Sequence, residues 1–283
     1  MAAPDRAIRA MTHDHGFRVI AASTTHSVRE VVARQAATGL VAKAVSDLVT
    51  AAVLLRETMS PNLRVQALLR GAGGKGSLVG DSFPDGPVRG LAQVRKGTDL
   101  SLGHGSMIQM MRTLPNGGVQ QGIVDVGQAG GIGEALTVYF QESEQVVSVA
   151  RIATRFDGDT LVAAGGFVVQ LLPEAERPLH AIMTQRLSDF PSMESFLAQE
   201  GFSADLLMSE LVYGMAHTEL GRQELRFHCR CDETLVLSAL SSLSKEDVQS
   251  MVDDGEGLEI HCDYCGKDYA IAVERLRALL AQS

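Results

Sequence analysis

All four cysteines of this 283-residue chain lie in its last fifth, as one C-x-C pair and one C-x-x-C pair. The first pair is Cys229 and Cys231, in "HCRCDE", and the second is Cys262 and Cys265, in "HCDYCG". Closely spaced thiol pairs let each half-site approach a tetrahedral Zn(II) ion without a long loop. Thirty residues separate the pairs, which leaves room for a helical insert. The pattern predicts one zinc ion held by these four cysteines.

Two other uses of the thiols stay open at this point. The zinc could be a constitutive structural ion in a small ribbon that serves as a protein-interaction adaptor. Alternatively, C-x-x-C could be the redox motif of a thiol-disulfide oxidoreductase, but that motif opens a helix, which lowers the thiol pKa. Here "CGKDYAIAV" predicts a turn and a strand instead. His228 and His261 each precede a cysteine, and we expect them to flank the site rather than to bind the metal.

Composition and charge narrow the class of protein. Apolar residues at 45% and charged residues at 21% are typical of a globular chain. The net charge is -9, and residues 229–283 hold 5 Lys+Arg against 11 Asp+Glu, which opposes a nucleic-acid partner. The longest uncharged run, residues 160–173, is shorter than the roughly 20 residues of a membrane helix. With no secretory apolar run in the first twenty residues, we expect a cytoplasmic protein with reduced thiols.

Hydrophobic periodicity predicts an α+β fold in three segments. Residues 1–173 alternate strand-like runs with turn signals and a few helices, which predicts a mainly antiparallel sheet with packed helices. In one of these helices Lys43 and Asp47 share a face, and the opposite, apolar face should pack on a sheet. Residues 174–226 have helical spacing and predict a helical linker. Residues 227–283 predict a small zinc domain, which is only marginally stable without a bound metal or a covalent cross-link.

The string "GAGGKG" matches G-x-G-x-x-G literally, at Gly71, Gly73 and Gly76. A dinucleotide fingerprint must open a helix, whereas "SLVGDSFPDG" predicts another strand and turn. We therefore expect a glycine-rich hairpin here. The sequence also lacks a G-x-S-x-G or H-E-x-x-H string, so we expect no catalytic site and no enzyme activity.

These residues resemble a known family, the redox-regulated thirty-three-kilodalton heat-shock chaperones of the bacterial cytosol. The carriers are "FHCRCDETLV" and "IHCDYCGKDY", with four upstream strings in the expected order: "DSFPDGPVRGLA", "GIVDV", "YFQESEQ" and "GGFVVQLLP". The resemblance covers nearly the whole chain and implies an ATP-independent holdase, a chaperone that binds unfolding proteins without refolding them.

The resemblance also implies how such a holdase is switched. Reduced thiolates on zinc keep it inactive; oxidants form disulfides between Cys229 and Cys231 and between Cys262 and Cys265, and zinc leaves. The small domain and the linker then lose structure, and an oxidised homodimer binds unfolded or partly unfolded client proteins. We expect the small domain to be the packing partner of an apolar stripe on the linker helices. The predicted client-binding residues of that stripe are Leu187, Phe196, Leu206, Leu207, Leu211 and Met215.

Overall fold

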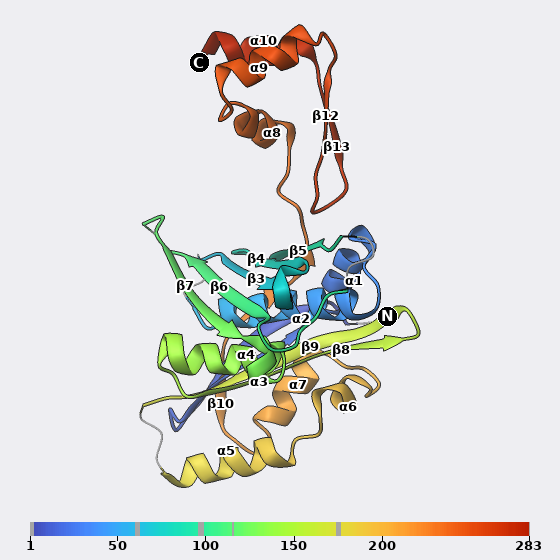
Figure 1. Ribbon diagram of the computed structural model, residues 1–283. Helices are drawn as coiled ribbons and strands as arrows, with labels where there is room; N and C mark the ends of the chain where they lie inside the picture. Colours follow the sequence, from blue (N-terminus) through green and yellow to red (C-terminus); the bar gives the residue numbers. More distant parts are fainter. Residues whose placement is uncertain (1–2, 60–62, 96–98, 115, 174–176, 283) are drawn as a thin grey trace. The chain divides into compact units, whose positions relative to one another are not determined.

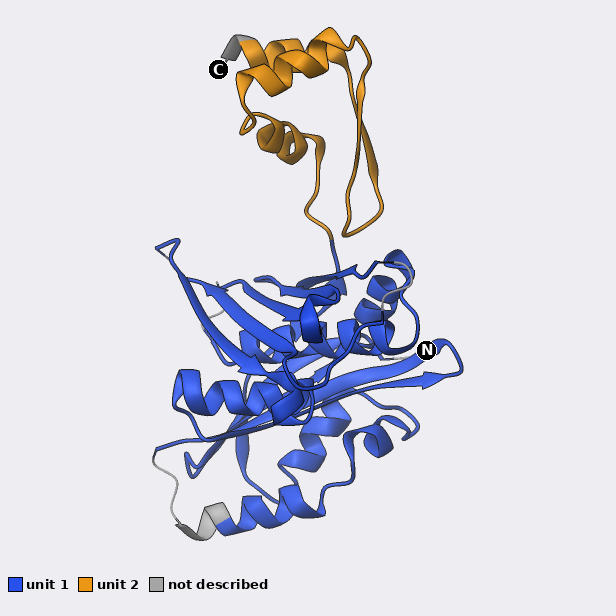
Figure 2. Cartoon of the chain, in the orientation of Figure 1, with its two compact units in different colours: residues 1–228 blue, residues 229–283 orange. Residues whose placement is uncertain are grey.

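The computed structural model describes residues 3–59, 63–95, 99–114, 116–173 and 177–282. The chain forms two compact units, Met1–His228 and Cys229–Ser283 (Figure 2). The first three residues of the predicted linker, 174–176, lie outside the described residues. The functional division into three segments stays a prediction.

One sheet of the larger unit has five antiparallel strands in the order β10-β1-β2-β9-β8 (Figure 1). The strands are β1 Arg6–Thr12, β2 Phe17–Ser23, β8 Ser148–Asp157, β9 Thr160–Leu171 and β10 His217–Glu224. Alternate residues of β2 belong to two different apolar clusters: Ile20 and Ala22 to one, Val19 and Ala21 to the other. Because neighbouring side chains of a strand point to opposite faces, both faces of this sheet are apolar and need cover.

The second sheet has six strands in the order β11-β5-β4-β3-β6-β7. The strands are β3 Val65–Arg70, β4 Ser77–Ser82, β5 Pro87–Gln93, β6 Met107–Thr113, β7 Val119–Asp125 and β11 Arg226–Phe227. All neighbours pair antiparallel except β11 and β5. The "GAGGKG" string forms the short 3-10 turn η1 (Ala72–Gly74) between β3 and β4. The predicted glycine-rich hairpin is confirmed, and so is the mainly antiparallel α+β class.

Helix α2 (Gly39–Glu57) packs against strands of both sheets, so it lies between them (Figure 1). The sequence predicted that Lys43 and Asp47 share a face opposite the apolar face that packs on a sheet, and this prediction is wrong in one respect. Lys43 does pair with Asp47 at 2.8 Å, but Asp47 is only 8% exposed and also accepts a hydrogen bond from Thr154 at 2.7 Å. A helix with apolar residues around its whole circumference is stable only when it is covered on all sides, which two sheets provide.

Four shorter helical elements complete this part of the unit. They are α1 Thr25–Arg34, α3 Val126–Ala129, α4 Ile132–Tyr139 and the π-helical turn η2 Phe140–Glu144. The Asp5 carboxylate lies at the N-terminus of helix α1, where it accepts hydrogen bonds from the backbone N–H groups of His26 and Ser27 at 3.1 and 2.6 Å. This satisfies two of the N–H groups that a helix start leaves without a partner.

The predicted linker forms helices α5 Arg177–Asp189, α6 Met193–Leu197 and α7 Ala204–Leu211, followed by strand β10. The helices cover the second face of the five-stranded sheet, with Leu187, Phe196, Leu207 and Leu211 buried in one cluster with strand residues such as Phe167. The prediction that the small domain is their packing partner is therefore wrong. The apolar stripe packs on the sheet because that face would otherwise expose apolar side chains to water.

Strand β10 corrects a second prediction, since helices were expected throughout residues 174–226. Six of its eight residues are exposed, and it pairs with β1 along its whole length. A strand that is exposed on both faces lacks the alternation of apolar and polar residues from which strands are predicted. The sequence "HTELGRQE" therefore resembles a polar connection.

The smaller unit has three helices and one hairpin, which are α8 Glu233–Leu240, α9 Lys245–Asp253, β12 Leu258–His261, β13 Asp268–Ile271 and α10 Val273–Gln282. Its apolar cluster has five buried members, namely Leu240, Val252, Tyr269, Ile271 and Leu276. Ser244 caps α9 by accepting a hydrogen bond from the N–H of Asp247 at 3.1 Å. Among the described residues, no helix is both long and apolar enough to cross a membrane.

Candidate metal centre

The four cysteines come together in the smaller unit, with all their sulfur atoms within 4.8 Å of one another. The Sγ atoms of Cys229 and Cys262 lie 3.7 Å apart, and those of Cys231 and Cys265 lie 3.3 Å apart. A tetrahedral zinc site with Zn–S bonds of about 2.3 Å has sulfur atoms about 3.8 Å apart. The donor set and its spacing therefore fit one tetrahedral metal ion.

Cys262 and Cys265 are positioned by the turn between β12 and β13. The N–H of Cys262 donates to the carbonyl of Lys267 at 2.9 Å, and the N–H groups of Cys265 and Gly266 donate to the carbonyl of Cys262 at 3.2 and 2.8 Å. Gly266 has φ 72°, a left-handed conformation that glycine adopts without a steric penalty. The turn directs both thiols to the same side.

Cys229 and Cys231 lie in the extended segment that leads into α8. Asp232 ends this segment as the N-cap of the helix, and its carboxylate accepts a hydrogen bond from the N–H of Leu235 at 2.7 Å. The cap fixes the start of α8 at Glu233, two residues after Cys231. The position of the second thiol of the C-x-C pair is thereby tied to a helix end.

Tyr269 connects the thiols to the small apolar core. Its hydroxyl donates to the backbone carbonyl of Cys231 at 2.9 Å and also lies 3.2 Å from the Cys231 Sγ, while its ring belongs to the buried cluster. Cys231 and Cys262 themselves pack against that cluster. Any movement of these thiols therefore disturbs the core of the unit. Sequence analysis missed Tyr269, although its place two residues before the apolar Ile271 in β13 was a signal that it points inward.

The thiol pKa values show that the four thiols do not all ionise at neutral pH by themselves. Partial burial raises the pKa of Cys231, but hydrogen bonds from Tyr269 and from neighbouring thiols outweigh this and lower it to about 7. Burial, and then hydrogen bonds with the other thiols, raise the pKa of Cys265 to about 12. Burial also raises the pKa of Cys229. Four thiolates this close repel one another, so only a bound cation allows all of them to ionise at neutral pH.

The structure bears on two alternatives for this site, histidine ligands and a thioredoxin-like motif, neither of which was the expected one. Within the described residues the cluster holds only cysteines, and the His261 ring pairs with Asp268 through Nδ1 at 2.7 Å. The C-x-x-C pair is followed by strand β13 and does not open a helix, so the thioredoxin-like arrangement is absent at this motif. The two disulfide pairings stay a prediction. So do the metal-binding role of the cysteines and the client-binding role of the apolar stripe.

The fold and the site define a class: an α+β protein whose small second unit is built around a cluster of four thiols suited to a metal ion. A sequence model of the family described as "Hsp33 protein" matches residues 5–272. The chain belongs to the Hsp33 family.

Two curated relatives and one solved structure illustrate the similarity. The 33 kDa chaperonin of Syntrophotalea carbinolica is 28% identical, over 98% of this chain and 99% of its own length. A 33 kDa chaperonin of Thermus thermophilus is 29% identical, over 98% of this chain and 87% of its own. The crystal structure of the 33 kDa chaperonin of Thermotoga maritima has a TM-score of 0.82 and 23% identity, and it covers 99% of both chains.

Proposed function

We propose that this protein is a redox-regulated, ATP-independent holdase of the bacterial cytosol, which binds unfolding proteins without chemical turnover. The observation that carries the proposal is the combination of four clustered thiols with a unit whose apolar cluster has only five buried members. A unit of about 55 residues with so small a core is marginal on its own. Its folding therefore depends on the chemical state of the thiols.

In the reduced state, Cys229, Cys231, Cys262 and Cys265 would hold one Zn²⁺ as thiolates. When bound, zinc would supply charge compensation and roughly 10–16 kcal/mol of apparent folding free energy, as in other small zinc sites. Tyr269 would support the site, because its hydroxyl holds the backbone and the sulfur of Cys231. In this state the protein is inactive as a holdase.

Oxidation would remove the thiolate ligands. A peroxide takes two electrons from each pair and is reduced to water or an alcohol, while one sulfur–sulfur bond forms between Cys229 and Cys231 and another between Cys262 and Cys265. The first thiolate of a pair attacks the peroxide oxygen to give a sulfenic acid, and the second thiol displaces hydroxide from it. Without ligands for a metal, the smaller unit loses the free energy that keeps it folded.

Strand β10, together with the short strand β11 that follows it, would pass the change from the smaller unit to the rest of the larger unit. It lies in sequence between α7 and Cys229, and most of its side chains are exposed, so backbone pairing with β1 and surface ion pairs hold it in place. Segments with few buried apolar contacts open at the lowest free-energy cost. We therefore infer that β10 detaches first and that α5, α6 and α7 follow.

Detachment of these helices would uncover two apolar surfaces at once. One is the stripe of Leu187, Phe196, Leu206, Leu207, Leu211 and Met215, and the other is the sheet face beneath it, which includes Phe17 and Phe167. Exposed apolar surface of this extent binds unfolded chains with little sequence preference. Loss of β10 would also leave β1 as a free sheet edge, which favours association of two copies, so we expect a homodimer after oxidation.

The test is the aggregation of a thermally unfolding protein, measured together with zinc retention, before and after peroxide at mild heat. The holdase proposal predicts that suppression of aggregation rises as zinc is released. An adaptor with a constitutive zinc ribbon would instead lose binding, and an oxidoreductase would show disulfide turnover without suppression. The Cys262→Ser protein should suppress aggregation even without peroxide treatment. Leu243→Ser, a change at an exposed position of the same unit, should behave like the parent protein.

A further inference from the structure

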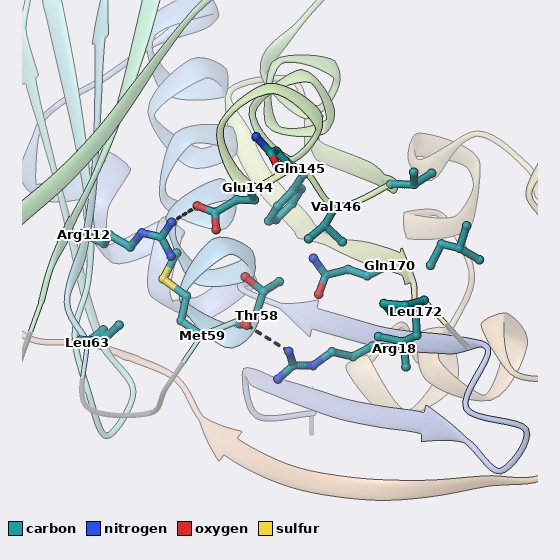
Figure 3. Close-up of a pocket in the computed structure, with 14 residues that line it drawn as sticks. Arg18, Thr58, Met59, Leu63, Arg112, Glu144, Gln145, Val146, Gln170 and Leu172 are labelled. Carbon is teal, nitrogen blue, oxygen red and sulfur yellow. Dashed lines mark hydrogen bonds and ion pairs between the residues drawn. The ribbon is translucent and has the colours of Figure 1, made fainter. Parts of the chain in front are cut away.

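The larger unit contains a cavity of about 530 Å³ that the proposed chaperone activity does not use. Its walls come from the end of α2, from β6, from the turn that follows α4, and from β2 and β9 (Figure 3). Its volume is in the range of small-molecule sites. Apolar and polar groups both face it: Met59, Val146 and Leu172 are apolar, and Arg18 and Arg112 are cationic.

The cationic side chains of this cavity are incompletely neutralised. Arg112 pairs with Glu144, whose carboxylate also accepts the Tyr139 hydroxyl at 2.9 Å. Arg18 donates to the carbonyl of Thr58 at 3.1 Å and has no carboxylate within ion-pair distance among the described residues. The Nε atoms of Arg18 and Arg112 are buried without a hydrogen-bond partner within that same part of the chain. Burial, with repulsion from Arg9, lowers the pKa of Arg18.

The surroundings add positive charge rather than remove it. Arg9 and Arg56 both use the same carboxylate, that of Glu57 at the end of α2. Glu57 is therefore shared by two arginines, and it attracts Arg18 only from beyond ion-pair distance. The lining of the cavity thus has an excess of one cationic group, and Arg9, Arg56 and Glu57 together add a second beside it. The C-terminal carbonyl groups of the helix stabilise cations near them.

The backbone of the cavity wall is unusual at two consecutive places. Residues Phe140–Glu144 form a π-helical turn, and Gln145 follows with φ 57°, in the left-handed region. π-helical turns occur frequently at functional sites, and a non-glycine residue in this region stores strain that the surroundings must hold. The turn brings Glu144 and Gln145 to the cavity, opposite Gln170 of β9 (Figure 3).

We propose that this cavity is a binding site for a small amphipathic monocarboxylate. The carboxylate accepts hydrogen bonds from the guanidinium group of Arg18, because the planar fork of arginine forms strong, paired contacts with a carboxylate. The aliphatic part lies against Met59, Val146 and Leu172. A monoanion is favoured over a phosphate dianion because Glu144 already neutralises Arg112, which leaves one uncompensated cation.

The experiment is calorimetric titration of the reduced, zinc-loaded full-length protein with octanoate, acetate and octanol. We expect octanoate to bind at least tenfold more tightly than acetate, which lacks the aliphatic part, or octanol, which lacks the charge. Arg18→Gln should weaken octanoate binding about tenfold. Arg155→Gln, at an exposed position of β8 outside the cavity, should leave it unchanged.

Glu144→Gln gives the sharper test, because it removes a negative charge that lines the cavity and repels an anion, while its amide oxygen can still accept the Tyr139 hydroxyl. We expect this variant to bind octanoate several-fold more tightly, a gain that a merely structural role of Glu144 would not produce. The melting temperature of each variant establishes that it is folded. Absence of octanoate binding, equal affinity for octanoate and octanol, or unchanged binding in Arg18→Gln would overturn the proposal. Each of these outcomes leaves the holdase activity untouched.

Discussion

The two units of this protein are stabilised in different ways. In the larger unit, α2 is enclosed by two sheets, and a second apolar cluster fills the space between the five-stranded sheet and helices α5 to α7. In the smaller unit, a few apolar side chains surround Tyr269, and the thiols themselves are part of the packing. The fraction of surface that a domain buries on folding rises with its size. The larger unit can therefore be stable through its core alone, whereas we expect the smaller unit to need a bound metal or a covalent cross-link as well. Under the proposed mechanism, a switch in the second unit would alter that unit, β10 and helices α5 to α7, while α2 and the strands around it stay folded.

The largest expected effect comes from Cys262→Ser. This change removes one thiolate and disturbs the apolar cluster against which Cys262 packs, so we expect loss of metal and unfolding of residues 229–283, with α2 and the strands around it intact. Zinc content and the dispersion of amide signals in a proton–nitrogen spectrum measure both. A folded, metal-loaded Cys262→Ser protein would contradict the claim that the smaller unit, unlike the larger one, depends on its four thiolates for stability.

A smaller effect is expected from Leu207→Ala. Leu207 is fully buried between α7 and the five-stranded sheet, so the cavity left behind should lower the free energy of unfolding by about 2–5 kcal/mol. If the helices cover the client-binding surface, the reduced protein should also suppress aggregation measurably without peroxide. Denaturant unfolding and the aggregation assay check the two parts. Leu206→Ala, at the half-buried neighbouring position, is the matched control and should have a smaller effect on both.

Tyr269→Phe tests the contact between the core and the thiols. The ring and its packing remain, while the hydrogen bonds to the carbonyl and sulfur of Cys231 are lost. Loss of an outer contact of this kind typically weakens metal binding by about 10- to 100-fold, and we expect the lower end, about 1.4 kcal/mol. Competition with a chromogenic zinc chelator measures the affinity. An unchanged affinity would show that the thiols are positioned independently of the core.

The smallest effect is expected from Arg222→Gln in β10. Arg222 pairs with Asp205 at 2.6 Å and with Glu219 at 2.9 Å, but all three side chains are well exposed. Exposed ion pairs of this kind contribute about 1 kcal/mol or less. Thermal unfolding of the reduced protein should therefore change little. A loss of several kcal/mol would mean that side-chain contacts, rather than backbone pairing, hold β10 on the sheet.

Local signals in the sequence predicted much of this structure. The glycine-rich hairpin and the clustering of cysteines each depend on a few neighbouring residues with a defined geometry. The sequence also indicated an apolar stripe on the linker helices. It did not indicate which surface the stripe covers, because that depends on the second apolar face of a sheet whose strands are far apart in the chain.

Apart from Tyr269, the features that sequence analysis missed have no local signature. β10 is exposed on both faces and lacks alternation, so only its pairing with β1 makes it a strand. Arg18 and Arg112 lie on strands of different sheets and line one cavity only after the fold is formed. Likewise, the π-helical turn before Gln145 continues an ordinary helical pattern. These features follow from tertiary packing, which a single sequence does not encode position by position.

The most direct test of the account is hydrogen exchange, followed by mass spectrometry, of the reduced zinc-loaded protein and of the same protein after peroxide and mild heat. We predict that residues 229–283 lose nearly all protection, that β10 and helices α5 to α7 lose part of theirs, and that α2 and the strands around it keep theirs. Retained protection of residues 229–283 in the oxidised, zinc-free protein would contradict the claim that thiolate–metal bonds hold this unit folded.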